Sequence, residues 1–175
     1  MNFLIIDTSS PQSFVALSKG CDLTIKYLSP LKQSQTLLPA IENLLEDTSI
    51  DFIAIGTGPG AFTGTRVGVM AAKALSFSKE IPLLPFCSLK IFTPNSNGPF
   101  TLYSDAKSRG FYALDGERSG ESATFGSPKL VADGSICSTL NIPFLKQYLL
   151  KKFHQASPSN HAEVTISYLL DSVVK

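Results

Sequence analysis

The sequence predicts a mixed α/β protein built from two lobes, and three observations support this fold class. Short apolar runs alternate with stretches of helical periodicity. Both halves open on a predicted β-hairpin with an aspartate in or beside it, Asp7 in the first and Asp105 in the second. A segment rich in proline, glycine and asparagine separates the halves. We therefore expect lobes at 1–93 and 100–175, joined by a linker at 94–99.

The first lobe is expected to begin with three strands. The run 3–6 is apolar throughout and ends at Asp7, which is typical of a buried central strand. The runs 13–18 and 23–28 follow it, with Lys19-Gly20 as the turn between them. Three successive strands predict an antiparallel meander, which argues against a simple Rossmann order.

Helices and strands then alternate to complete this lobe. Apolar residues recur at three- and four-residue spacings over 34–46, which predicts a helix with Pro39 within about its first turn. A buried strand is expected at 51–55, a second helix at 64–77 and a short strand at 82–86. Ser88 is suited to cap a short helix after that strand.

The second lobe gives weaker signals. A hairpin is expected from 100–103 and 111–114, and 116–138 indicates at most a weak strand. Helices are expected at 142–152 and 162–174. Lobes that each open on a hairpin are the construction of actin, hexokinase and their relatives, a ribonuclease H-like fold.

Composition limits the classes of function. Of the 175 residues 43% are hydrophobic and 17% are charged, as in an ordinary globular protein. The formal net charge of +1 supplies no general attraction to nucleic acid. Three cysteines without a CxxC pair favour a reducing compartment. No run of 18 apolar residues occurs, so we expect a cytoplasmic protein without a membrane partner.

The glycine-rich stretch 56–68 has two interpretations. As a phosphate loop it departs from both common patterns, because Gly64 is followed by Thr65-Arg66 and Pro59 removes one amide. As a packing element, Gly64, Gly68 and Ala72 form a strip of small residues on one helix face. Such a strip admits either a second helix or the protein's own sheet, and the sequence leaves both open.

Other candidate sites are weaker. The two aspartates lack the glycines that would let backbone amides reach the phosphates of ATP, so a turn-capping role is favoured. His154 and His161 are seven residues apart across a predicted loop, which does not suit a metal-binding pair. The basic and aromatic residues at 107–112 are typical of a solvated hairpin tip, although such a patch also suits RNA.

Several motifs resemble the bacterial TsaB (YeaZ) family in order and spacing. They are Asp7-Thr8-Ser9, the segment 34–39, the block 58–68, Lys73-Ala74-Leu75, Ser88-Leu89, and Asp105-Ala106-Lys107 with Tyr112. The likeness covers residues 1–114. Gln33 stands where the family usually has histidine, and Cys87 stands where serine is usual. The region after 116 is shorter than the resemblance leads us to expect, so we expect a reduced second lobe.

The resemblance implies an actin-like fold with degraded nucleotide chemistry at Asp7 and Asp105. It implies a non-catalytic scaffold that binds the catalytic TsaD-type subunit for threonylcarbamoyl transfer to the adenosine beside the anticodon of tRNAs. A TsaE-type ATPase is implied as a further partner, with tRNA bound only through the complex. ATP and metal are expected in the partner subunits, and no catalytic residue, cofactor or metal in this chain.

The resemblance also implies a homodimer or a heterodimer through the two helices of the first lobe. The interface candidates on these helices are Leu37, Leu38, Ile41, Leu45, Gly64, Gly68, Ala71, Ala72 and Leu75. The alternative function is a weak actin-like ATPase or kinase that uses the Asp7 hairpin and the Gly56–Gly60 turn. A glycoprotease-like hydrolase is a third hypothesis, for which the chain supplies no predicted metal site.

Overall fold

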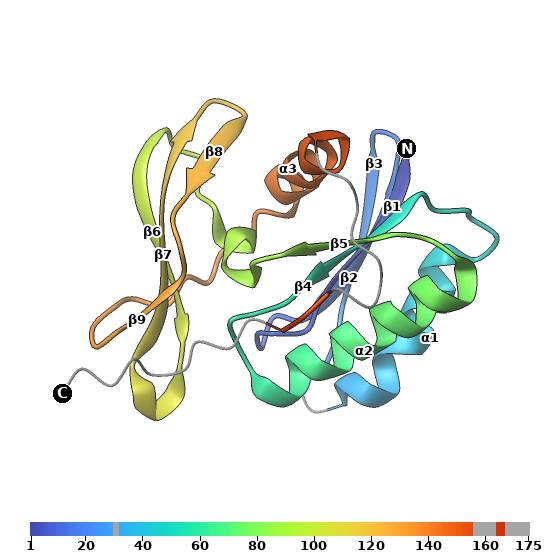
Figure 1. Ribbon diagram of the computed structural model, residues 1–175, viewed down its shortest axis with the longest axis horizontal. Helices are drawn as coiled ribbons and strands as arrows, with labels where there is room; N and C mark the ends of the chain where they lie inside the picture. The colour runs from blue at the N-terminus through green and yellow to red at the C-terminus, as the bar shows by residue number, and fades with distance from the viewer. Residues whose placement is uncertain (30–31, 156–163, 167–175) are drawn as a thin grey trace.

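A computed structural model describes residues 1–29, 32–155 and 164–166 (Figure 1). The elements of the first part are β1 (Asn2–Asp7), β2 (Phe14–Lys19), β3 (Asp22–Tyr27), α1 (Gln33–Leu45), β4 (Phe52–Gly56), α2 (Phe62–Lys79), β5 (Leu83–Phe86) and the 3₁₀ helix η1 (Ser88–Phe92). Those of the second part are β6 (Gly98–Asp105), η2 (Lys107–Arg109), β7 (Phe111–Ser119), β8 (Ser122–Phe125), β9 (Lys129–Val131) and α3 (Ile142–Gln155).

The first part is a five-stranded mixed sheet with the order β3-β2-β1-β4-β5. The first three strands pair antiparallel, as the predicted meander requires, and β4 and β5 continue the sheet parallel to β1. Since β1 is central, Phe3 to Ile6 are buried on both sides. The predicted mixed α/β class and the buried central strand are confirmed.

The two faces of this sheet have different coverings (Figure 1). Alternation along β1 sends Leu4 and Ile6 to the face that α1 and α2 cover. Phe3 and Ile5 point to the opposite face, where α3 and residues of the second sheet complete the core. Burial on both faces explains why the strands of the sequence are apolar throughout and do not alternate.

The second part is a smaller antiparallel sheet around the long strand β7. β6 pairs with β7 along its whole length, while β8 and β9 pair with successive parts of its other edge. Leu102 of β6 and Leu114 of β7 belong to the same buried cluster as Phe3 of the first sheet. The division into lobes at 94–99 stays a prediction, since the two parts share one hydrophobic core.

Helix α3 connects the two parts by packing on the first sheet. The ring of Phe153 stacks on Phe52 at 4.1 Å between centroids, and Phe52 stacks in turn on Phe3 at 4.4 Å. The buried ammonium of Lys146 donates to the carbonyls of Cys21 and Asp22 in the β2–β3 turn. A helix predicted for the second lobe thus covers the sheet of the first.

Three sequence expectations need correction. Helix α1 begins at Gln33, so Pro39 lies in the helix interior, where the burial of neighbouring residues on the sheet compensates for one lost backbone bond. The region 116–138 contains all of β8 and β9 and the end of β7, because its polar strands are held by pairing with β7. Most of the predicted helix at 162–174, and His161, lie outside the described residues; residues 164–166 are not helical.

Candidate functional site

The turn after β1 is held by the carboxylate of Asp7. Asp7 is fully buried, and its Oδ1 accepts hydrogen bonds from the backbone N–H of Ser9 at 2.9 Å and from the Ser9 hydroxyl at 2.7 Å. A short acidic side chain that bonds the amide two residues later stabilises a turn. The turn-capping role predicted for Asp7 is confirmed.

The glycine-rich turn 56–60 packs directly on this Asp7 turn. A Cβ atom at Gly56 would lie 1.9 Å from Asp7 Oδ2, and one at Gly60 would lie 2.3 Å from the carbonyl oxygen of Ser9. The backbone N–H of Ala61 donates to that same carbonyl at 2.6 Å. Glycine is needed at these positions because a Cβ atom would collide with the Asp7 carboxyl or with the backbone of Ser9, so the close partner is protein.

Further hydrogen bonds join this turn to the segment after β5. The N–H of Gly58 donates to Ser88 Oγ at 3.0 Å, and the N–H of Ser88 donates to the carbonyl of Gly58 at 2.9 Å. The N–H of Thr57 donates to the carbonyl of Phe86 at 3.0 Å. A phosphate loop presents its amides to a ligand, whereas these amides are already bonded within the chain.

Burial sets the charge state of Asp7. Desolvation raises the pKa of its carboxyl above the usual 3.8, against smaller lowering effects of Ser88 and Ser9. Its Oδ2 is buried and has no hydrogen-bond partner among the described residues. Burial therefore favours the protonated form of this carboxyl more than water does, and this environment suits a structural role better than the binding of a cation.

Asp105 caps the equivalent turn of the second part but lies in solvent. Its Oδ1 accepts from the N–H of Lys107 at 2.6 Å, and its Oδ2 pairs with the Lys107 ammonium at 2.6 Å. Hydrogen bonds from Lys107 lower the pKa of the Asp105 carboxyl. Arg109 donates to the hydroxyl of Tyr112 at 2.6 Å, so the predicted basic and aromatic patch is bonded within its own hairpin.

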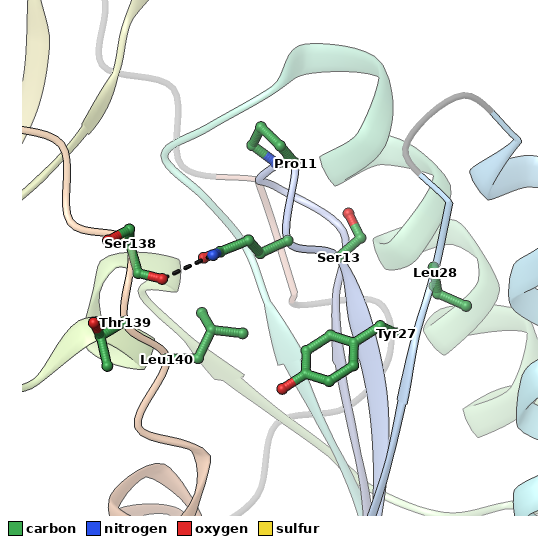
Figure 2. A pocket seen from close by; sticks show the side chains of 8 residues that line it. Pro11, Ser13, Tyr27, Leu28, Ser138, Thr139 and Leu140 are labelled. Carbon is green, nitrogen blue, oxygen red and sulfur yellow. Dashed lines mark hydrogen bonds between the residues drawn. The ribbon is translucent and has the colours of Figure 1, made fainter.

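An open pocket of about 560 Å³ lies beside the β1–β2 turn (Figure 2). Figure 2 shows Tyr27 and Leu140 among its lining side chains, and the amide of Gln12 donates to the carbonyl of Ser138 at 2.7 Å. Only neutral side chains line this pocket: Pro11, Gln12, Ser13, Tyr27, Leu28, Ser138, Thr139 and Leu140. Sequence reasoning missed the pocket because it joins segments 126 residues apart.

The strip of small residues on α2 packs against the Asp7 turn. A Cβ atom at Gly68 would lie 2.2 Å from Thr8 Oγ1, and one at Gly64 would lie 2.1 Å from the Thr8 carbonyl oxygen. The Thr8 hydroxyl donates to the carbonyl of Gly64 at 2.6 Å. Of the two interpretations that the sequence left open, the structure supports packing within the chain.

The predicted interface residues divide into two groups. Six are buried within the chain, on the side of the helices that faces the sheet: Leu37, Ile41, Leu45, Gly64, Gly68 and Ala72. Ala71 and Leu75 are half-buried, and Leu38 is 52% exposed. A contact between chains through the buried six would require the helices to leave the sheet. Their role as an interface is untested, and Leu38 is the candidate best placed for one.

Other exposed apolar side chains extend the candidate surface along α2. Met70 is 66% exposed and Phe77 is 69% exposed, and Phe62 near the start of the helix is also exposed. We call Leu38, Phe62, Met70 and Phe77 the outer helix surface. The spacing of 62, 70 and 77 on a helix was the signal that sequence reasoning overlooked in favour of the glycines.

A family model described as TsaD, tRNA N6-adenosine threonylcarbamoyltransferase, matches residues 31–128, which is more than half of the chain. The tRNA threonylcarbamoyladenosine biosynthesis protein TsaB of Bacillus subtilis is 33% identical over 102 residues, and that of Haemophilus influenzae is 34% identical over 95. The chain belongs to this family, as a TsaB (YeaZ) member.

The extent of the TsaB likeness differs between sequence and fold. The alignment covers 54% of this chain and 44% of the Bacillus subtilis protein, and 51% and 40% for Haemophilus influenzae, so it spans less than half of these relatives. The structure of YeaZ from Pseudomonas aeruginosa matches with a TM-score of 0.79 and 19% identity, over 96% of this chain and 99% of that one. The TsaB fold, actin-like as predicted, thus extends beyond the aligned sequence.

The described residues contain neither a helix that could span a membrane nor a cluster of metal-binding side chains. No helix in the described ranges combines the length and apolarity needed to cross a bilayer. Nor does any group of three or more histidine, cysteine, aspartate and glutamate side chains in this part of the TsaB chain have an arrangement that suits a metal ion.

Proposed function

We propose that this chain is a non-catalytic scaffold subunit in the biosynthesis of threonylcarbamoyladenosine in tRNA. The observation that carries the proposal is the closure of the glycine-rich turn on the Asp7 turn, with its amides bonded to Ser9, Phe86 and Ser88. Because its amides are bonded within the chain, the glycine-rich turn acts as a structural element and not as a phosphate-binding loop. The names of the curated relatives supply the process to which the scaffold would contribute.

The outer helix surface is the proposed binding site for a TsaD-type catalytic subunit. Burying one large apolar side chain contributes about 1.5–3 kcal/mol, so covering Leu38, Met70 and Phe77 would give a partner a substantial part of its binding free energy. The same surface would support a homodimer when the chain is alone. A TsaE-type ATPase and tRNA would then associate through the complex, with ATP and metal held by the partners.

Co-purification of the tagged chain with the TsaD-type subunit of the same organism, sized by light scattering, tests this proposal. Met70→Glu should weaken the complex at least tenfold, because it buries a charge in the apolar contact. Ile136→Glu is the matched control, since Ile136 is similarly exposed at 55% but lies in the second part. Absence of a wild-type complex, or equal weakening by both substitutions, would contradict the proposed scaffold and its surface.

A weak actin-like ATPase or kinase is the second candidate. The neutral pocket beside the Asp7 turn is the observation in its favour, because it could hold a base next to the hairpin that carries the buried carboxyl. Mg²⁺-dependent ATP binding in the micromolar range by the isolated chain, lost in Asp7→Asn, would support it. Absence of ATP binding, with a stable complex as above, would exclude it.

A further inference from the structure

Two lysines from different elements converge between the first sheet and α3. Lys90 of η1 donates from its ammonium to the hydroxyl of Tyr148 at 2.5 Å. The same ammonium lies 4.5 Å from the ring centroid of Phe125 and 4.6 Å from that of Tyr148. Lys152, one helical turn after Tyr148 on α3, donates to the carbonyl of Pro85 at 2.9 Å.

This cluster has two positive charges and no matching negative charge in the described part of the chain. The ion pairs found there are Lys107 with Asp105 and Lys129 with Asp115, both in the second part. Lys90 and Lys152 are both half-buried, and desolvation lowers the pKa of each ammonium. Tyr148 and Cys87 raise the pKa of Lys152, whereas repulsion from Lys90 lowers it. Half-buried cations in this arrangement cost free energy unless an anion joins them.

The neighbouring groups are suited to an anion. Burial raises the pKa of the Tyr148 hydroxyl, which therefore keeps a proton that it can donate. Burial likewise raises the pKa of the Cys87 thiol, so this group stays neutral and does not repel an anion. The side chains of this cluster are only partly buried: Cys87, Lys90, Tyr148 and Lys152. Each lysine ammonium has three N–H donors, of which one is bonded, to Tyr148 in Lys90 and to Pro85 in Lys152.

We propose that Lys90, Tyr148 and Lys152 form a binding site for a small phosphate-type oxyanion between η1 and α3. The two ammonium groups would share its charge, and the Tyr148 hydroxyl would donate one hydrogen bond. Charge-assisted bonds to phosphate oxygens are the strong class of hydrogen bond. None of these three residues belongs to the Asp7 turn or to the outer helix surface, and the site does not depend on the proposed scaffold function.

Calorimetric titration of the full chain with inorganic phosphate tests the site. We expect saturable one-to-one binding by the wild-type chain and at least a tenfold weaker affinity in Lys152→Gln and in Lys90→Gln. Lys151→Gln is the matched control, because Lys151 is the adjacent exposed lysine and bonds Glu121 and Ser122. It removes the same charge from the same helix and should leave the affinity unchanged.

The outcomes distinguish a specific phosphate site from nonspecific electrostatic attraction between phosphate and the lysines of the chain. Circular dichroism establishes that each variant is folded before its affinity is compared. Glycerol phosphate in place of phosphate distinguishes a phosphate monoester from the free ion, and binding of either supports the site. The proposal would be overturned if neither ligand bound saturably at concentrations up to 10 mM, a limit that corresponds to about 2.7 kcal/mol of binding free energy. It would also be overturned if the Lys151 and Lys152 variants lost affinity equally.

Discussion

The two aspartate turns of this molecule perform the same local task in different surroundings. Asp7 and Asp105 each follow a strand of a hairpin and accept a hydrogen bond from the amide two residues later. Asp7 is fully buried under the glycine-rich turn, and burial raises the pKa of its carboxyl. Asp105 is 40% exposed beside Lys107, which lowers the pKa of its carboxyl. The same turn chemistry therefore gives opposite pKa shifts, and packing decides which one occurs.

The largest effect is expected from a change that forces the two turns of the first part apart. Gly56→Ala would place a Cβ atom 1.9 Å from Asp7 Oδ2 within a buried strand end, and should destabilise the protein by about 3 kcal/mol. Urea unfolding measures the loss. Gly120→Ala is the control in the second part: its φ is +59° but the space around it is open, so about 1 kcal/mol is expected. Equal losses would show that the close contact is unimportant.

A smaller effect is expected from Asp7→Asn, measured as stability against pH. The raised folded-state pKa means that the folded protein retains the proton of Asp7 above pH 3.8, where the unfolded chain loses it. The contribution of Asp7 to stability is therefore full below that pH and is lost as the pH rises through the folded-state pKa. Asp7→Asn should remove this decrease while the amide oxygen still accepts from Ser9. Parallel stability curves for the variant and the wild type would contradict the buried neutral acid.

The smallest effect is expected from Asp105→Asn, and it has the opposite sign. The folded-state pKa of Asp105 is lowered, so its contribution is present above pH 3.8 and is lost as the pH falls through the folded-state value. The variant should be slightly less stable than the wild type at pH 7, and this difference should shrink as the pH falls below 3.8. Because both partners are exposed, added salt should reduce the difference. A difference that stays constant as the pH falls below 3.8 would contradict this explanation.

Much of the fold of the first part could be predicted from the sequence. The apolar run 3–6, the meander and the two periodic stretches correspond to β1, the first three strands, α1 and α2. Both faces of the sheet are covered, so each strand is continuously apolar and its signal is strong. The second part was harder, because β8 and β9 are short and polar and exist by pairing with β7.

The residues of close approach in the candidate site could be predicted from the sequence, but the neighbours that they contact could not. The sequence singled out Gly64 and Gly68 as places of close approach, and both are such places. It did not show that the close neighbour is Thr8, 56 residues away from Gly64. Pattern reasoning therefore favoured the glycines as an interface, while Met70 and Phe77 on the exposed side of the same helix went unnoticed.

By itself the sequence determined the order of the elements, the capping of turns by Asp7 and Asp105, and the positions where only glycine fits. These features depend on backbone conformation and on neighbours in the chain. Tertiary structure decided which side of α1 and α2 is buried, the raised pKa of the Asp7 carboxyl and the meeting of Lys90 with Lys152. Those properties depend on which distant segments pack on a side chain and exclude water from it. The order of residue types along the sequence does not show which distant segments come into contact.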